Sequence, residues 1–465
     1  MPIGPTIAAP DALAQLWKEA RLPDDALTFA RLSGSDPVLA SSFCVGAAAQ
    51  STIAAAALAA CELAYTRGAE RQQVRVDMAH AALECSSWFS VDGVSPDVWD
   101  KFSGLYACAD GWVRVHANFA HHRDGALRLL GLDPAAAERA DAERAMAAWR
   151  AVDFETAAAG AGLVASALRT FTQWDTSDPG RALAALPLFT LERIGDALPR
   201  VLPALAEDAQ PLSGIRVLDL TRILAGPVGT RAMAAYGADV LMVNAPHLPN
   251  IEAIADTSRG KLSAHADLRA ATGRADLWRV LDGAHVFVQG YRPGALEALG
   301  FGAVQIAARC PGSVVVSLSA YGSEGPWSGR RGFDSLVQTA MGFNHAEGEA
   351  KGDGKPRPMP MQILDHASGY LMAFGAAAAL VRQQQEGGSW HVRLSLAQTA
   401  RWLRSLGRVD KGFAAVAPDR APYLERYHSG FGEVRAFRHC ADLARTPAAW
   451  VLPAMPPGSH PMRWP

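Results

Sequence analysis

Asp365 is the residue of this 465-residue chain whose type and position best suggest nucleophilic chemistry. It lies in residues 363–371 (ILDHASGYL), at the expected start of an Ala-rich helix over residues 366–381. The dipole and free N–H groups of a helix N-terminus keep a carboxylate ionised, and they can hold the negative charge of an acyl-transfer intermediate. Local sequence alone favours a simpler role as helix N-cap. The two roles are compatible.

Other catalytic and metal-binding motifs are missing from the sequence. The strand expected at residues 215–220 is not followed by G-x-G-x-x-G, and the chain contains no Walker loop, H-E-x-x-H or G-x-S-x-G motif. His121 and His122 are adjacent, so their side chains point in different directions and do not predict a metal site. The sequence therefore predicts no metal ligands and no tightly bound cofactor.

Composition excludes several classes of partner. The chain has 44 Lys and Arg against 46 Asp and Glu, so nucleic acid and anionic membranes are not expected partners. The six cysteines are scattered and are expected to be reduced. The first 20 residues lack the features of a secretory signal, and the Ala-rich stretch Ala47–Ala60 is too short to span a bilayer. A cytoplasmic location is expected.

The clearest structural pattern lies between Leu212 and Ala400. Apolar runs alternate there with segments compatible with helices, which predicts an α/β fold: an open parallel Rossmann-like sheet with helices on both faces. Ligands bind at the carboxyl ends of such strands. The expected strands are residues 215–220, 239–243, 285–289 and 313–319.

The N-terminal part differs and contains a partial repeat. Residues 105–116 predict a hairpin that turns at Asp110-Gly111, within a smaller α+β domain. Residues 74–80 (VRVDMAH) resemble residues 392–398 (VRLSLAQ), 318 positions later, and both follow a long Ala-rich helix. The same offset aligns Ala47 with Asp365. We interpret the chain as two incomplete copies of one unit.

Four ordered segments resemble the class III CoA-transferase family, which includes formyl-CoA and carnitine CoA-transferases and α-methylacyl-CoA racemase. They are residues 211–242 (PLSGIRVLDLTRILAGPVGTRAMAAYGADVLM), 288–301 (VQGYRPGALEALGF), 317–338 (SLSAYGSEGPWSGRRGFDSLVQ) and 364–369 (LDHASG). Residues 104–190 resemble the small domain of that family, which normally follows the nucleotide-fold half and here precedes it. The resemblance therefore covers most of the chain in permuted order.

The resemblance implies four regions. Residues 1–95 would be a helical lead-in and a partial, degenerate copy of the large domain, and residues 96–205 the small α+β domain. Residues 211–405 would form the Rossmann-like, CoA-binding catalytic half, and residues 406–465 an extended C-terminal tail that returns to the large domain. One Asp365 site per chain is expected, where the small domain meets residues 211–340.

The resemblance also implies a mechanism. Asp365 would attack an acyl-CoA thioester and form a mixed anhydride, then an aspartyl-CoA thioester, and a carboxylate acceptor would then take the CoA. Coenzyme A is in this case a substrate, and a homodimer is the assembly to test. The positions that match CoA contacts in the family are Ile223, Leu224, Ala225, Gly290, Tyr291, Arg292 and Arg331.

Several of these positions have simpler alternatives. Arg330 and Arg331 could form a solvated turn instead of a phosphate site, and Tyr291 could pack in the core instead of stacking on adenine. Phe333 stands where racemases of the family carry His, which disfavours an acyl-CoA racemase or isomerase. Gly290 replaces the usual Asn, and Asn244 the usual Glu, so a non-catalytic CoA-binding subunit is a third alternative.

Overall fold

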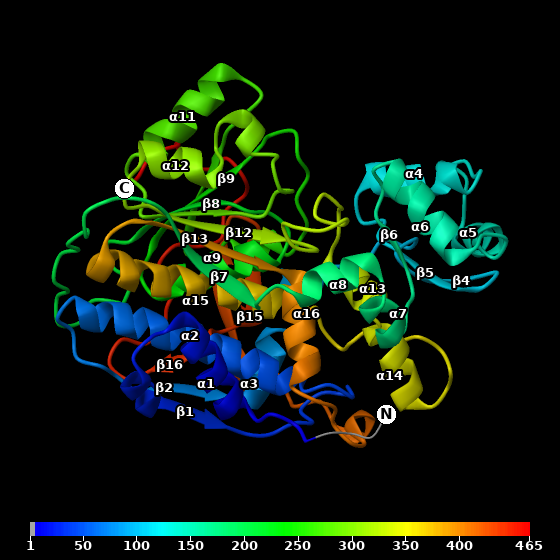
Figure 1. Cartoon of the computed structure of the whole chain (residues 1–465), viewed down its shortest axis with the longest axis horizontal. Helices are drawn as coiled ribbons and strands as arrows, with labels where there is room; N and C mark the ends of the chain where they lie inside the picture. The colour runs from blue at the N-terminus through cyan, green and yellow to red at the C-terminus, as the bar shows by residue number, and fades with distance from the viewer. Residues whose placement is uncertain (1–4) are drawn as a thin grey trace.

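The computed structural model describes residues 5–465 and is built around a seven-stranded sheet (Figure 1). The strand order is β10-β9-β8-β11-β12-β13-β7; the first six strands are parallel, and β7 is antiparallel to β13. The strands are β7 (Phe189–Gly195), β8 (Arg216–Leu220), β9 (Asp239–Asn244), β10 (Lys261–His265), β11 (Val286–Gln289), β12 (Val314–Ser319) and β13 (Ser389–Ser395).

Helices cover both faces of this sheet, as the sequence predicts. Side chains alternate between the two faces of a strand. Leu218 and Phe287 pack on one face with α11 (Ala271–Leu281) and α12 (Ala303–Arg309), whereas Val217 and Val288 pack on the other with α9 (Ala225–Ala235) and α15 (Ile363–Glu386). Figure 1 shows α11 and α12 above the sheet and α15 below it.

A further layer packs beneath α15. It contains α1 (Ala9–Ala20), α2 (Val45–Thr66), α3 (Met78–Glu84) and α16 (Leu396–Ser405), together with a small sheet of β1 (Ala30–Ser33), β2 (Val74–Asp77) and β16 (Asp442–Leu443). Helices α2 and α15 are long and apolar enough to cross a membrane, but 100% and 94% of their most apolar windows are buried in the molecule. Helix α2 extends beyond the Ala-rich stretch Ala47–Ala60 at both ends, and its burial identifies it as a core helix.

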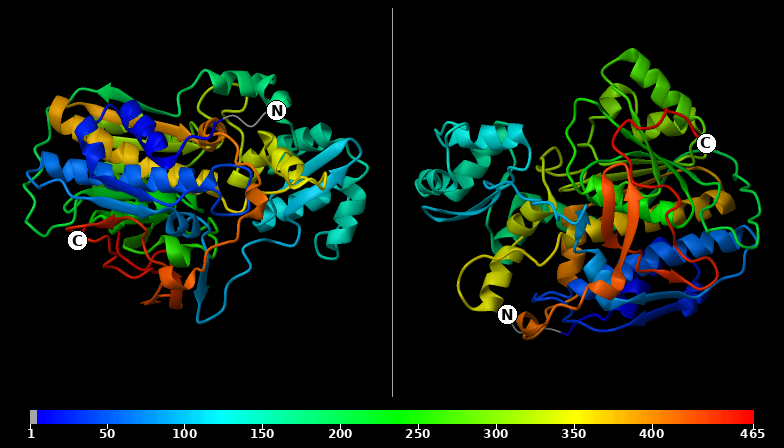
Figure 2. Two further views of the ribbon diagram at one scale, coloured as in Figure 1. Left: turned by 90° about the horizontal axis from the view of Figure 1, so that it is seen from below. Right: turned by 180° about the vertical axis from the view of Figure 1, so that it is seen from behind.

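A smaller unit with its own core lies beside the sheet. The hairpin of β4 (Gly104–Cys108) and β5 (Gly111–Val115) forms as expected and is joined by β6 (Ala165–Ala167). Both views in Figure 2 show this unit at one end of the molecule. Its helices are α4 (Ala120–Leu129), α5 (Arg139–Met146) and α6 (Ala151–Gly160).

The remaining elements connect these layers or belong to the C-terminal part. A third sheet contains β3 (Phe89–Val91), β14 (Leu424–Ser429) and β15 (Gly432–Phe437). The other helices are α7 (Phe171–Asp175), α8 (Asp178–Ala184), α10 (Ile254–Thr257), α13 (Asp334–Ala340) and α14 (Phe343–Lys351), with 3-10 turns η1 (Asp24–Phe29), η2 (Glu297–Leu299), η3 (Gly412–Ala414) and η4 (Ala421–Tyr423).

The structure differs from the expected regions in two places. Strand β7 lies within residues 96–205 but pairs with β13, so the compact small unit ends before it. Residues 406–465 are not simply extended, because β14 and β15 form a hairpin. The end of the tail contacts helix α11, where Trp464 donates to the Val280 carbonyl at 2.9 Å. Residues 1–4 of the expected region 1–95 lie outside the described residues.

The two segments of the sequence repeat have matching element starts. Helices α2 and α15 begin at Val45 and Ile363, and helices α3 and α16 at Met78 and Leu396, which are 318 residues apart in each pair. Strands β2 and β13 precede α3 and α16 respectively.

Candidate active site

Asp365 is the third residue of α15, not its N-cap. The helix begins at Ile363, three residues before the expected start, and its N-cap is Gln362, whose side chain makes no capping bond. The N-cap interpretation of Asp365 is therefore wrong.

Asp334 takes that capping role from another element. Its Oδ2 accepts a hydrogen bond from the Asp365 backbone N–H at 3.0 Å, and its side chain also accepts from Gln338. Asp334 is fully buried at the start of α13. Within residues 5–465, the Asp365 carboxylate accepts no side-chain or backbone hydrogen bond. Because Asp334 caps the helix, the Asp365 carboxylate is free to face a cavity.

Three cavities meet around Asp365. The first, which we call the Asp365 cavity, has a volume of about 290 Å³. The second, the middle cavity, has about 110 Å³ and is also lined by Asp365. The third, the basic cavity, has about 420 Å³. Ile223 and Phe333 line all three.

The structure brings every residue matched to a CoA contact to these cavities. Leu224 lines the Asp365 and middle cavities, and Gly290 lines the middle and basic cavities. The others follow the same path: Ile223 lines all three, Ala225 the middle cavity, and Tyr291, Arg292 and Arg331 the basic cavity.

Arginines dominate the charge of the basic cavity. Arg222, Arg292, Arg330 and Arg331 line it, and its described lining contains no Asp or Glu. Arg331 is not a freely solvated turn residue, because it donates to the Gly162 carbonyl at 3.1 Å. Burial and then the neighbouring Arg292 lower the pKa of Arg331. A cavity of this charge suits phosphate groups.

The backbone between β8 and α9 is strained where it approaches Asp365. Ile223 has φ 76°, a left-handed conformation that a β-branched residue rarely adopts. Helix α9 begins two residues later at Ala225, and the N–H groups of its first turn have no partners within the helix. Ala225 and Gly226 line the middle cavity beside Asp365, so the positive end of α9 faces the carboxylate.

Two glycines set the distance between α9 and α15. A Cβ atom added to Gly229 would lie 2.4 Å from the Gly369 carbonyl oxygen, and one added to Gly369 would lie 2.3 Å from the Ala225 carbonyl oxygen. Neither position can therefore carry a side chain without moving a helix. This close contact holds Asp365 next to the strained loop.

The two aspartates raise each other's cost of ionisation. Burial, and then the neighbouring Asp334 carboxylate, raise the pKa of Asp365 well above its usual value. Burial raises the pKa of Asp334 to about 6, although the backbone N–H of Asp365 and the Gln338 side chain oppose that shift. Two like charges this close do not ionise independently.

Sequence reasoning missed the residues that the small unit contributes. Trp99, Arg114 and His116 line the Asp365 cavity opposite Ile223 and Leu224. The His116 ring stacks on Phe333 with ring centroids 4.0 Å apart. These residues lie about 250 positions before Asp365 in the sequence, and no local motif connects them to it. The Asp365 cavity therefore lies where the small unit meets the nucleotide-fold half, and residues of both line it.

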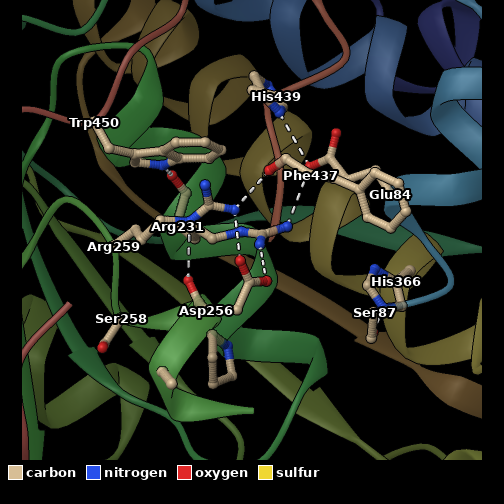
Figure 3. A network of polar contacts seen from close by, with 12 residues as sticks. Glu84, Ser87, Arg231, Asp256, Ser258, Arg259, His366, Phe437, His439 and Trp450 are labelled. Carbon is tan, nitrogen blue, oxygen red and sulfur yellow. Dashed lines mark hydrogen bonds and ion pairs between the residues drawn. The ribbon is translucent and has the colours of Figure 1, made fainter. Parts of the chain in front are cut away.

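A buried polar network lies behind α15 (Figure 3). The Glu84 carboxylate accepts from the Tyr370 hydroxyl at 2.6 Å and lies 3.1 Å from Arg231 and 3.2 Å from His439. Burial opposes ionisation, but His439 and Arg231 outweigh it and lower the pKa of Glu84. The network joins α3, α9, α15 and the C-terminal part around the back of the site.

His366 follows Asp365 but does not share its cavity. It is 1% exposed, and its Nε2 contacts the Ser87 hydroxyl (Figure 3). Burial lowers the pKa of His366 to about 3, so the ring is neutral. The described residues that line the Asp365 cavity include Ser87 but not His366.

Comparisons with known proteins identify relatives that are named as acyl-CoA or CoA-transferases. The Mycobacterium tuberculosis protein named "Probable fatty acyl-CoA transferase Rv3272" is 33% identical over 211 residues, which cover 42% of this chain and 53% of that protein. An "Acyl-CoA transferase" of Gibberella moniliformis is 28% identical over 379 residues, covering 72% and 66%. The human "Succinyl-CoA:glutarate CoA-transferase" is 32% identical over 192 residues, covering 38% and 43%.

The chain thus spans about half the length of the curated relatives that it matches. A family model described as "CoA-transferase family III" matches residues 212–443. That range contains the strands β8 to β13, the strained loop at Ile223, and both Asp334 and Asp365. Through residues 212–443, the chain belongs to CoA-transferase family III.

Proposed function

We propose that this protein transfers CoA from an acyl-CoA thioester to a carboxylic acid, with Asp365 as the nucleophile. One observation carries the proposal: the Asp365 carboxylate accepts no hydrogen bond from residues 5–465 and lines both the Asp365 cavity and the middle cavity, which adjoins the basic cavity. The acyl group would occupy the Asp365 cavity, and the CoA phosphates the basic cavity.

In the first half of the reaction, a carboxylate oxygen of Asp365 attacks the thioester carbonyl carbon. The tetrahedral oxyanion collapses with loss of the CoA thiolate, which leaves a mixed anhydride between Asp365 and the acyl group. The thiolate then attacks the aspartyl carbonyl, forms an aspartyl-CoA thioester and releases the acyl group as its carboxylate. The N–H groups of Ala225 and Gly226 are suited to stabilise the oxyanions.

In the second half, the acceptor carboxylate attacks the aspartyl-CoA carbonyl and displaces the thiolate. The thiolate attacks the acyl carbonyl of the new anhydride, which gives the new acyl-CoA and restores Asp365. No step transfers a proton, so the site needs no general base. The neutral His366, which lies outside the cavity, is consistent with this.

The raised pKa of Asp365 serves this chemistry. A carboxylate that is poorly solvated and lies beside another carboxylate is a stronger nucleophile once it is ionised. The relatives are named for different acids, a fatty acyl group in one and succinate and glutarate in another.

Mass spectrometry tests the proposal directly. The protein is incubated with acetyl-, butyryl-, succinyl- or glutaryl-CoA, treated with borohydride or hydroxylamine, and digested. We expect one modified Asp365 peptide per chain. Asp365→Asn should lower CoA transfer by at least about 1,000-fold, because the amide is not a nucleophile. Asp196→Asn is the matched control, since the Asp196 side chain is fully exposed.

Stability separates loss of chemistry from loss of fold. The folded-state pKa of Asp365 lies above its unfolded value, so the stability present at low pH is lost as the pH rises through the folded-state pKa. Asp365→Asn removes this loss, and its melting temperature at pH 8 should rise by a few degrees. An inactive variant that is also less stable, or an unmodified Asp365 peptide with every thioester, would contradict the proposal.

An acyl-CoA racemase is the second candidate, because the His116 ring lines the same cavity as Asp365 and could face the substrate from the opposite side. Incubation in D₂O without an acceptor acid distinguishes the two. Deuterium at the α-carbon of the recovered acyl-CoA would favour the racemase, and its absence together with CoA transfer would favour the transferase.

A further inference from the structure

We propose that the Asp365 cavity selects a dicarboxylic acyl group, and that Arg114 binds the carboxylate that does not react. This inference rests on the proposed CoA transfer and adds the substrate class. The relevant feature is a buried arginine with no protein partner, on the wall of the cavity that holds the nucleophile.

The strand β5 directs Arg114 into the cavity. Successive side chains of a strand point to opposite faces. Val113 and Val115 pack in the core of the small unit, so Arg114 and His116 face the other way, toward Asp365. The register of this hairpin therefore places the Arg114 guanidinium in the same cavity as the Asp365 carboxylate.

Arg114 is buried and still unpaired. It is 6% exposed, and its Nε has no hydrogen-bond partner. No ion pair or side-chain hydrogen bond connects it to any residue between 5 and 465, and its guanidinium lies over the Trp99 ring, whose centroid is 5.3 Å from Cζ. Burial lowers the pKa of Arg114 only to about 10, so the side chain stays charged at neutral pH. A buried unpaired cation is costly unless a ligand pairs with it.

The carboxylates of the site itself do not fill this role. Asp365 is the only acidic residue in the described lining of the cavity. The charge of the buried Asp334 raises the pKa of Arg114 but does not offset the effect of burial, and no hydrogen bond or ion pair joins these two side chains. During the proposed reaction, Asp365 loses its charge when it becomes an anhydride or a thioester. Arg114 would then have no carboxylate in the cavity near it.

The carboxylate of the substrate that pairs with Arg114 is the one that does not react. A reacting carboxylate is neutral whenever it is an acyl group, so it would leave Arg114 unpaired for half of each turnover. A second carboxylate at the far end of the chain keeps its charge throughout. Its two oxygens match the fork of a guanidinium.

The cavity also limits the length of the acid. A volume of about 290 Å³ is at the lower end for ligand cavities. Apolar residues between its ends, including Val98, Phe89 and Met361, suit a short methylene chain. A four- or five-carbon dicarboxylate combines both features.

Isotope exchange tests the preference for a dicarboxylic acid without a second kind of acyl group. The protein is given glutaryl-CoA with ¹³C-glutarate, or pentanoyl-CoA with ¹³C-pentanoate, and the label entering the thioester is measured by mass spectrometry. The two acids have the same number of carbons and differ by one carboxylate. We expect kcat/KM for glutarate to exceed that for pentanoate by about 100-fold.

Variants of Arg114 locate the effect. In Arg114→Gln, kcat/KM for glutarate should fall about 100-fold, mainly through KM, while exchange of pentanoate changes less than about threefold. Arg114→Lys should restore part of the glutarate exchange, because it restores the charge but not the fork. Arg144→Gln is the matched control in the same unit, since the Arg144 side chain is 71% exposed.

Direct binding keeps this test separate from the test of the proposed function. Calorimetric titration of the unsubstituted protein with glutarate and with pentanoate, repeated with Arg114→Gln, needs no turnover. Glutarate binding that depends on Arg114 supports the inference even if no acid exchanges and Asp365 is never labelled. That result would contradict only the proposed CoA transfer. Preference for pentanoate, or an equal loss of both acids in Arg114→Gln, overturns the inference.

Discussion

At the scale of residues, the carboxyl groups of Asp334 and Asp365 have different roles at the start of α15. Asp334 is fully buried, accepts the helix N–H and lines none of the three cavities described above, whereas the Asp365 carboxylate accepts no such bond and lines two of them. The negative charge of Asp334 also contributes to the raised pKa of Asp365. We therefore regard Asp334 as a positioning residue.

Asp334→Asn tests this role. The amide oxygen can still accept the Asp365 N–H, but the neighbouring negative charge is gone, so the pKa of Asp365 falls. Attack requires ionised Asp365, and the rate of aspartyl-CoA formation rises with pH through that pKa. The acid limb of the pH profile should therefore move to lower pH, with a rate at pH 8 within about tenfold of the unsubstituted protein.

The control for this variant is Asp353→Asn, which removes a surface carboxylate that pairs with Arg357 and accepts from the Lys355 N–H in the turn after α14. Its pH profile should not move. If the Asp334→Asn profile stays in place as well, Asp334 is a capping residue without influence on the nucleophile.

The sequence predicted only part of this site. Asp365 and the seven positions matched to CoA contacts follow from motifs that are local in sequence. The roles of Asp334 and Arg114 do not, because each depends on which atoms a side chain meets in three dimensions. The positive φ of Ile223 is equally invisible, since isoleucine is not a residue that predicts such a backbone.

At the scale of elements, the close contact of α9 with α15 controls the distance between the Ile223 loop and Asp365. Gly369→Ala places a Cβ against the Ala225 carbonyl and must separate the helices. We expect a loss of about 1–3 kcal/mol in the free energy of unfolding. CoA transfer should fall by at least about tenfold, since small displacements at a reacting centre are costly.

Gly160→Ala is a matched control for that variant. Gly160 also lies in a helix, as the last residue of α6, but a Cβ added there meets no atom within 4 Å. Urea denaturation and a transfer assay of both variants are the measurements. Equal effects of the two substitutions would show that helix propensity, rather than the contact, is responsible.

The elements themselves were predictable to different degrees. The four expected strands all form because each is a run of apolar, β-branched residues. Strand β10 (KLSAH) was not predicted because it is short and mixed in polarity. Strand β7 was not predicted because it follows the small unit and pairs with a strand about 200 residues later. Antiparallel addition at a sheet edge leaves no local sequence signal.

At the scale of the whole molecule, the Glu84 network joins segments from both ends of the chain. Glu84→Gln removes the carboxylate that faces His439 and leaves the buried Arg231 with Asp256 as its remaining carboxylate partner. We expect a loss of about 3–5 kcal/mol in the free energy of unfolding, measured with urea. Glu70→Gln removes an exposed pair with Arg445 and should change stability by less than about 1 kcal/mol; similar losses in both would contradict the special role of the network.

The starts of α2 and α15 are both capped by a carboxylate from another segment. The Asp36 carboxylate accepts from the N–H groups of Gly46 at 3.0 Å and Ala47 at 2.8 Å at the start of α2, as Asp334 accepts from Asp365 at the start of α15, although the two caps do not correspond at the 318-residue offset. Ala47 stands where α15 carries Asp365. We propose that residues 1–95 derive from the same unit and lack the nucleophile.

The walls of the Asp365 cavity come from two units of one polypeptide: Arg114 and His116 from the small unit, Ile223 and Leu224 from the large one. Covalent linkage fixes their local concentration, however dilute the solution. Turnover per molecule should consequently be the same at nanomolar and micromolar protein, whereas a pocket completed by a separate subunit would empty as that subunit dissociated.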